Sequence, residues 1–102
     1  FDIILLGMGP DGHTASLFPN HPALKVNQGL VTHLQDSPKP PPERLTLTLN
    51  TINQAKHKIV VATGQSKAEI IKEVLHEKSQ KYPIGLVDQL VWYLDHAAAS
   101  KL

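Results

Sequence analysis

The chain has 102 residues, of which 41% are hydrophobic and 19% charged, a composition typical of one folded domain and not of a disordered segment. Ten lysines and arginines against nine acidic residues leave a formal net charge of +1, so no strong positive field attracts nucleic acid or an anionic membrane. Cysteine is absent, which excludes disulfides, thiolate nucleophiles and cysteine metal sites together.

Short apolar runs separated by turn residues predict strands alternating with helices. The run at 2–6 does not alternate and predicts a buried strand of a parallel sheet, whereas 44–49 alternates strictly and predicts a half-buried strand. The other expected strands are 29–34, 58–63 and 90–94, and the expected helices are one turn at 14–18, then 51–55, about 66–78, and a short C-terminal helix capped by Asp95. This order predicts an α/β fold with an open, mostly parallel sheet flanked by helices. No repeat or linker divides it, so we expect residues 1–102 to form a single domain.

A glycine-rich turn follows the first predicted strand. Residues 7–12 read G-x-G-x-x-G, with Gly7, Gly9 and Gly12, and therefore raise the possibility of a dinucleotide site. That site needs a long helix after the third glycine. Pro19 and Pro22 leave room for hardly more than one turn, so we disfavour a dinucleotide. A ligand-free glycine turn at the end of a strand is the simpler alternative.

The same turn carries the best candidate for catalysis. Asp11 and His13 flank Gly12, just past the carboxyl end of a buried strand, where open α/β sheets bind ligands. Histidine suits proton transfer near neutral pH, and a carboxylate beside it fixes its tautomer and stabilises its charged form. We therefore expect Asp11 and His13 to act as a catalytic pair. None of the other five histidines has metal-ligand spacing to another, and we expect no metal site.

A second constellation joins the strand at 58–63 to the following helix. Gly64 precedes Ser66 and Lys67, and Ser66 with Glu69 has the spacing of a capping box. A helix N-terminus offers free N–H groups, while a lysine there opposes the helix dipole and gains nothing structurally. Lys67 in this position therefore indicates an anion nearby, and a phosphate monoester fits. The spacing is not that of a P-loop.

Residues 36–42 are too rich in proline for regular structure and predict a rigid loop before the next strand. Arg44 opens that strand and is equally compatible with anion binding and with a plain charge at a strand edge. The P-x-x-P at 38–41 also matches ligands of SH3 domains, but it lies between two predicted strands. We therefore favour a loop beside an active site over a docking motif.

Four stretches of the chain, in order, closely resemble motifs of the 6-phosphogluconolactonases. They are residues 1–22, with GMGPDGHTASLFP at 7–19; DSPKPPPERLTLTL at 36–49; VATG at 61–64 with SKA at 66–68; and WYLD at 92–95 with AAA at 97–99. The related glucosamine-6-phosphate deaminases share the Asp-Gly-His but carry a glutamate five residues after the histidine. Phe18 stands at that position here, which favours the lactonase.

The resemblance implies hydrolysis of 6-phospho-D-glucono-1,5-lactone to 6-phosphogluconate in the oxidative pentose phosphate pathway, without metal or organic cofactor. His13 matches a general base acting on water, and Asp11 matches a carboxylate that positions the histidine or the sugar. Arg44 and Lys67 match basic residues on the phosphate side of the pocket. We expect the glycines Gly9, Gly12 and Gly64 to line it as well.

Family members are commonly more than twice as long, and this chain resembles their C-terminal part only. We therefore expect a site that is incomplete alone, completed by an N-terminal part or a second copy. The alternatives are a phosphosugar-binding fragment without turnover and a deaminase-like isomerase. No apolar run approaches the ~20 residues that span a bilayer, and no signal peptide is recognisable. With the pathway, this predicts a cytoplasmic protein without membrane or nucleic-acid partners.

Overall fold

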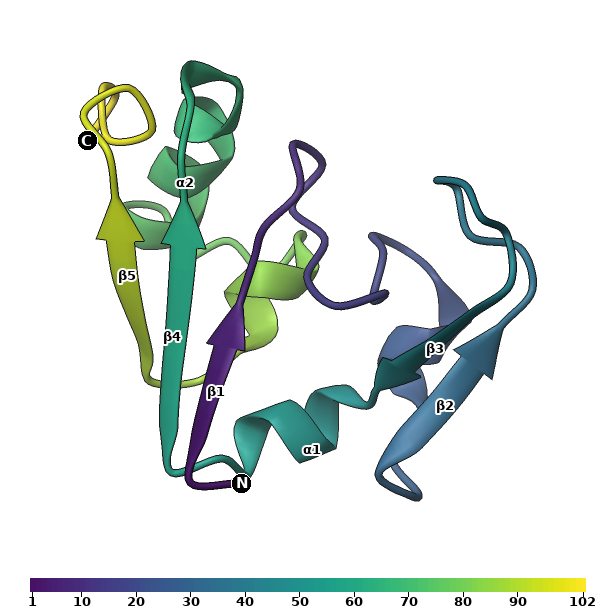
Figure 1. The fold of residues 1–102 in the computed structure, drawn as a ribbon. Coiled ribbons are helices and arrows are strands. Elements are labelled where there is room, and N and C mark those ends of the chain that lie inside the picture. Colours follow the sequence, from purple (N-terminus) through teal and green to yellow (C-terminus); the bar gives the residue numbers. More distant parts are fainter.

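A computed structural model describes residues 1–102 and contains a three-stranded parallel sheet (Figure 1). The strands are β1 (Ile3–Leu6), β4 (His57–Ala62) and β5 (Leu90–Leu94), in the order β1-β4-β5. The register pairs Ile3 with His57 and Lys58 with Leu90. All three strands therefore end at the same edge of the sheet, and the segments that follow them meet there (Figure 1).

One face of this sheet carries the core. Ile4, Leu6, Val60 and Ala62 are buried in one cluster with side chains of two helices, α1 (Leu49–Asn53) and α2 (Ala68–Leu75), and of the 3-10 turn Pro83–Leu86. The helical members of the cluster, Ile52, Ile71 and Ile84, are completely buried. Thr48 caps α1, because its hydroxyl accepts a hydrogen bond from the backbone N–H of Thr51.

The opposite face of the sheet is open. Strand residues alternate between the two faces, and those that point away from the core remain exposed. Ile3 and Leu5 on β1, Val61 on β4, and Val91 and Tyr93 on β5 are each at least half exposed. We call these five residues the open face. The expected parallel sheet is confirmed, but the helices cover only one side of it.

A separate antiparallel hairpin lies beside the sheet, on the far side of α1 (Figure 1). It consists of β2 (Val31–Leu34) and β3 (Arg44–Leu47), with Val31 opposite Leu47. The proline-rich loop 35–43 joins them, closed at its base by a hydrogen bond from the N–H of Ser37 to the carbonyl of Pro42. A short 3-10 turn, Pro22–Lys25, contacts β2.

The five expected strands are all present, but three expected helical features are wrong. Residues 14–18 form a tight turn, because Ala15 has a φ of 50° and the Thr14 hydroxyl donates to the carbonyl of Gly7. The capping box is not formed: no side chain caps α2, which begins at Ala68 after the 3-10 turn Gln65–Lys67.

The expected C-terminal helix is replaced by turns. Asp95 does cap this segment, because its carboxylate accepts from the N–H of Ala98 at 2.8 Å. The backbone bonds that follow mix two spacings, with Ala99 bonded four residues back and Ser100 three residues back. A segment this short forms too few hydrogen bonds to offset the unfavourable free energy of helix nucleation. None of the helices has the length and apolar character that crossing a bilayer requires.

Candidate active site

Asp11 and His13 are in direct contact in the loop that follows β1. Asp11 Oδ1 lies 2.5 Å from His13 Nδ1 and also accepts a hydrogen bond from the His13 backbone N–H at 3.2 Å. One carboxylate oxygen thus holds both the ring and the main chain of the histidine. Both side chains are mostly buried, with 18% of the His13 and 33% of the Asp11 side chain exposed. The expected pairing of these two residues is therefore present.

The surroundings of Asp11 keep it charged. Burial alone would raise the pKa of its carboxyl, but hydrogen bonds from the ring and backbone of His13, together with attraction to that imidazole, lower the pKa below the usual value. A charged Asp11 carboxylate can only accept hydrogen bonds, so the Nδ1 atom of a neutral His13, which faces it, carries the proton. The lone pair then lies on Nε2, which is the nitrogen able to take a proton from a bound molecule.

Two glycines make room for this pair. A Cβ at Gly9 would lie 2.1 Å from His13 Cε1 and 2.2 Å from Nδ1, so the imidazole rests directly against the Gly9 backbone. Gly12 has a φ of +83°, a left-handed conformation that lets Asp11 and His13 turn toward each other. The N–H of Gly12 donates to the carbonyl of Gly9, and the N–H of Gly9 donates to the carbonyl of His13. The loop is thereby closed by its own backbone.

An open hollow of about 370 Å³ lies beside the histidine. Its lining consists of Gly7, Met8, Gly9, His13, Thr14 and Ala15. The hollow is located at the carboxyl end of β1, which is the end where open α/β sheets take their ligands.

Phe18 connects His13 to Arg44. Its ring is 1% exposed, with its centroid 4.6 Å from that of the imidazole, and the Arg44 guanidinium carbon lies 5.5 Å from the same ring. Ser16 strengthens this connection, because its N–H donates to Thr46 Oγ1 and its hydroxyl accepts from Arg44 at 3.4 Å. In the sequence, Phe18 distinguishes two families but does not reveal these contacts, because they depend on how β3 docks.

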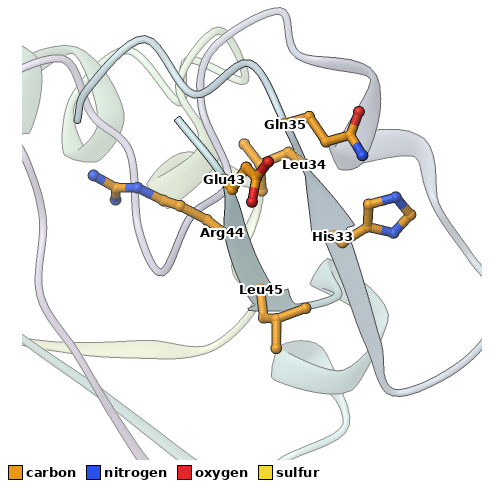
Figure 2. A pocket seen from close by; sticks show the side chains of 6 residues that line it. All are labelled: His33, Leu34, Gln35, Glu43, Arg44 and Leu45. Carbon is orange, nitrogen blue, oxygen red and sulfur yellow. The ribbon is translucent and has the colours of Figure 1, made fainter. Parts of the chain in front are cut away.

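Most of the Arg44 guanidinium is occupied by the proline-rich loop. Nε donates to the carbonyl of Pro41, and Nη2 donates to the carbonyls of Lys39 and Pro40. Only Nη1, with its long contact to Ser16, has hydrogen-bonding capacity left. Figure 2 shows that the side chain extends away from His33 and Gln35, which line a hollow of about 340 Å³ on the hairpin. That hollow contains neither member of the Asp11–His13 pair.

Gly64 and Lys67 lie at the same sheet edge as the His13 loop, after β4. Gly64 has a φ of +94°, and its N–H is taken by the carboxylate of Asp95 at 3.1 and 3.3 Å. Lys67 precedes α2, is partly exposed, and has no side-chain hydrogen bond or ion pair. The sequence did not reveal that Asp95 holds Gly64, because the two residues are far apart along the chain.

No group of three or more potential metal-ligating side chains is present.

Comparison with known proteins shows what the chain is similar to. A model of the family "Glucosamine-6-phosphate isomerases/6-phosphogluconolactonase" matches residues 1–92. The curated 6-phosphogluconolactonase of Bos taurus is 50% identical over 107 residues, which cover 100% of this chain and 42% of the relative. The chain thus spans about two-fifths of the length of the curated relatives it matches.

Comparison with solved structures finds the same two kinds of protein. The 6-phosphogluconolactonase of Trypanosoma brucei aligns with a TM-score of 0.82 at 35% identity, covering 100% of this chain and 42% of that one. A monomeric glucosamine-6-phosphate deaminase aligns with a TM-score of 0.75 at 26% identity, covering 99% of this chain and 48% of that one.

Proposed function

The chain belongs to the family of glucosamine-6-phosphate isomerases and 6-phosphogluconolactonases, and from this premise we propose that it carries the catalytic pair of a lactonase. The proposed reaction is hydrolysis of 6-phospho-D-glucono-1,5-lactone to 6-phosphogluconate. The contact between Asp11 and His13 beside an open hollow is the observation that carries the proposal. The relatives' names support the choice of substrate.

In the proposed mechanism, His13 acts as the general base. Its Nε2 takes a proton from a water molecule, whose oxygen forms a bond to C1 of the lactone. The tetrahedral intermediate then breaks the bond between C1 and the ring oxygen. The protonated His13 returns its proton to that oxygen, which leaves as the C5 hydroxyl. Asp11 stabilises the imidazolium between the two proton transfers, as its lowered pKa allows.

The 6-phosphate would be bound on the other side of the site. Lys67 supplies a charge without an ion-pair partner at the start of α2, where the helix dipole also favours an anion. Arg44 supplies its charge and Nη1, held in place by the proline-rich loop. Gly64 contributes its backbone shape and not a hydrogen bond, because Asp95 already accepts from its N–H. Binding energy from the phosphate would orient the lactone toward His13.

Two alternatives remain in competition. A deaminase-like isomerase is disfavoured because the buried Phe18 puts an apolar ring, and no second carboxylate, next to His13. A phosphosugar-binding fragment without turnover uses the same phosphate contacts and differs only in the chemistry.

The deciding assay is hydrolysis of freshly generated lactone above the spontaneous rate, beside titration with 6-phosphogluconate. We expect His13→Asn to abolish the acceleration and retain binding, with the exposed His33→Asn as matched control. Lys67→Met should weaken binding about tenfold or more, since it removes a charge-assisted contact, and Lys72→Met on the same helix should not. Binding without hydrolysis would favour the non-enzymatic alternative. A chain that neither binds 6-phosphogluconate nor hydrolyses the lactone would refute the proposal.

We further propose that residues 1–102 are the C-terminal part of a larger domain. Parallel sheets are normally covered on both faces, whereas the open face exposes five apolar side chains. Further chain of the same domain, or a second copy, would cover them. Analytical ultracentrifugation tests this: the chain should self-associate with increasing concentration, and Val91→Lys should reduce the association. A stable monomer with a cooperative, concentration-independent unfolding transition would contradict it.

A further inference from the structure

We propose that Tyr82 is a positioning residue for the Asp11–His13 pair. The catalytic meaning of this inference rests on the proposed function, whereas the contacts that support it are independent of that function. Tyr82 lies just before the 3-10 turn Pro83–Leu86, seventy residues along the chain from the loop it touches. The proposed mechanism does not use it.

The first observation is the contact between Tyr82 and Gly12. A Cβ built on Gly12 would lie 2.7 Å from Tyr82 Cβ, 2.8 Å from Cδ1 and 2.9 Å from Cγ. The base of the tyrosine side chain is thus packed directly against the one residue that separates Asp11 from His13. Gly12 is buried by this contact and has the left-handed φ on which the approach of its neighbours depends.

The second observation is that the backbone beside Tyr82 is bonded to the same glycine. The N–H of Ile84 donates to the carbonyl of Gly12 at 3.1 Å, and Ile84 is itself completely buried in the core. Gly12 is therefore held on two sides, by the Tyr82 side chain and by the Ile84 main chain. Because its N–H is bonded to Gly9, the peptide units around it have little freedom to rotate.

The third observation is that Tyr82 is itself fixed. Its hydroxyl donates to Glu73 Oε2 at 2.5 Å, and Glu73 belongs to α2. That hydrogen bond, with burial and the nearby negative charge, raises the pKa of Tyr82 above its usual value, so the hydroxyl stays protonated and able to donate. The Lys81 ammonium lies over the Tyr82 ring, 5.5 Å from its centroid.

Together these contacts connect α2 to the catalytic loop through Glu73, Tyr82 and Gly12. Lys67 lies at the start of the same helix. The proposal therefore predicts that losing the Tyr82 side chain displaces the His13 ring, although Tyr82 does not line the hollow beside that ring.

The test reads the position of His13 from the ¹H–¹³C NMR signals of its imidazole, assigned by their loss in His13→Asn, and from the NOEs between the imidazole protons and the Phe18 ring. Tyr82→Ala should shift these signals and weaken these NOEs, and Tyr82→Phe, which retains the ring but not the bond to Glu73, should have a smaller effect. Tyr93→Ala on the open face is the matched control and should leave them in place. Tyr82→Leu is the second variant, should the alanine variant fail to fold. His13 signals at their wild-type positions in a folded Tyr82→Ala or Tyr82→Leu protein would overturn the proposal.

Kinetics give an independent reading in whichever preparation hydrolyses the lactone. Displacement of a general base by a fraction of an ångström to 1 Å should lower kcat roughly tenfold to a hundredfold with little change in KM. A merely structural role would lower the amount of folded protein and leave kcat per folded molecule unchanged. Absence of both hydrolysis and 6-phosphogluconate binding in the wild type would refute the proposed function and leave the NMR test of Tyr82 decisive.

Discussion

Replacement of Gly9 by alanine tests whether the His13 ring must keep its present position. The backbone tolerates alanine there, because Gly9 is not among the glycines with positive φ. The new methyl group would lie 2.1 Å from His13 Cε1, whereas ordinary contact begins at 3.4 Å. The ring must therefore move by about 1.3 Å, the difference between these distances, or the loop must open.

Either response separates His13 from its carboxylate partner. The ring contact to Asp11 is 2.5 Å long, and a shift of this size stretches or breaks it. Misplacement of a catalytic group by about 1 Å costs on the order of a hundredfold in rate. Loss of the hydrogen bond should also lower the free energy of unfolding by about 1 kcal/mol, a value reduced for the partial exposure of Asp11.

The assay compares Gly9→Ala with Gly7→Ala, two residues away, where a Cβ meets nothing within 4 Å. Urea unfolding measures the stability, NMR the imidazole signals, and lactone hydrolysis the rate. We expect displaced imidazole signals and a rate near the spontaneous one in Gly9→Ala, with imidazole signals in place in Gly7→Ala. A folded Gly9→Ala protein with His13 signals and activity like the wild type would refute the steric argument.

Two further predictions concern stability. Lys58 is buried and its ammonium donates to the carbonyl of Asn53 at 3.0 Å, so Lys58→Met should lower the unfolding free energy by about 1 kcal/mol in urea titrations; an unchanged midpoint would show that the bond is dispensable. Hydrogen bonds from the backbone N–H of Ala98 and, to a smaller extent, of Gly64 lower the pKa of the Asp95 carboxyl. The stability that the charged carboxylate gives the fold is therefore present above about pH 4 and is lost as the pH falls through the lower folded-state pKa. Asp95→Asn should accordingly lose less stability than the wild type between about pH 5 and pH 2, and equal losses would contradict this assignment.

The sequence predicted the features that depend on neighbouring residues. Each strand is a contiguous apolar run, and β5 at Leu90–Leu94 has the bounds that its run indicates. The pairing of Asp11 with His13 was also predictable, because only one glycine separates them. In both cases the information needed lies within a few positions of the chain.

Features that depend on tertiary docking were not predictable from the chain. The contact of Phe18 with Arg44 requires the hairpin to pack against the His13 loop. The N–H of Gly64 reads as free for an anion until Asp95, at the end of the neighbouring strand, is seen to accept from it. The capping box at Ser66 failed because a 3-10 turn moved the start of the helix.

The parallel register has a consequence for the order in which this protein assembles. β1 pairs only with β4, and the first partners along that ladder are Ile3 and His57. Until β4 has been synthesised, β1 lacks the partner that it has in this sheet, and such non-local pairing folds slowly because a long loop must close first. The loop that bears Asp11 and His13 is thus fixed at the sheet edge only after the distant strand β4 has been synthesised and has paired with β1.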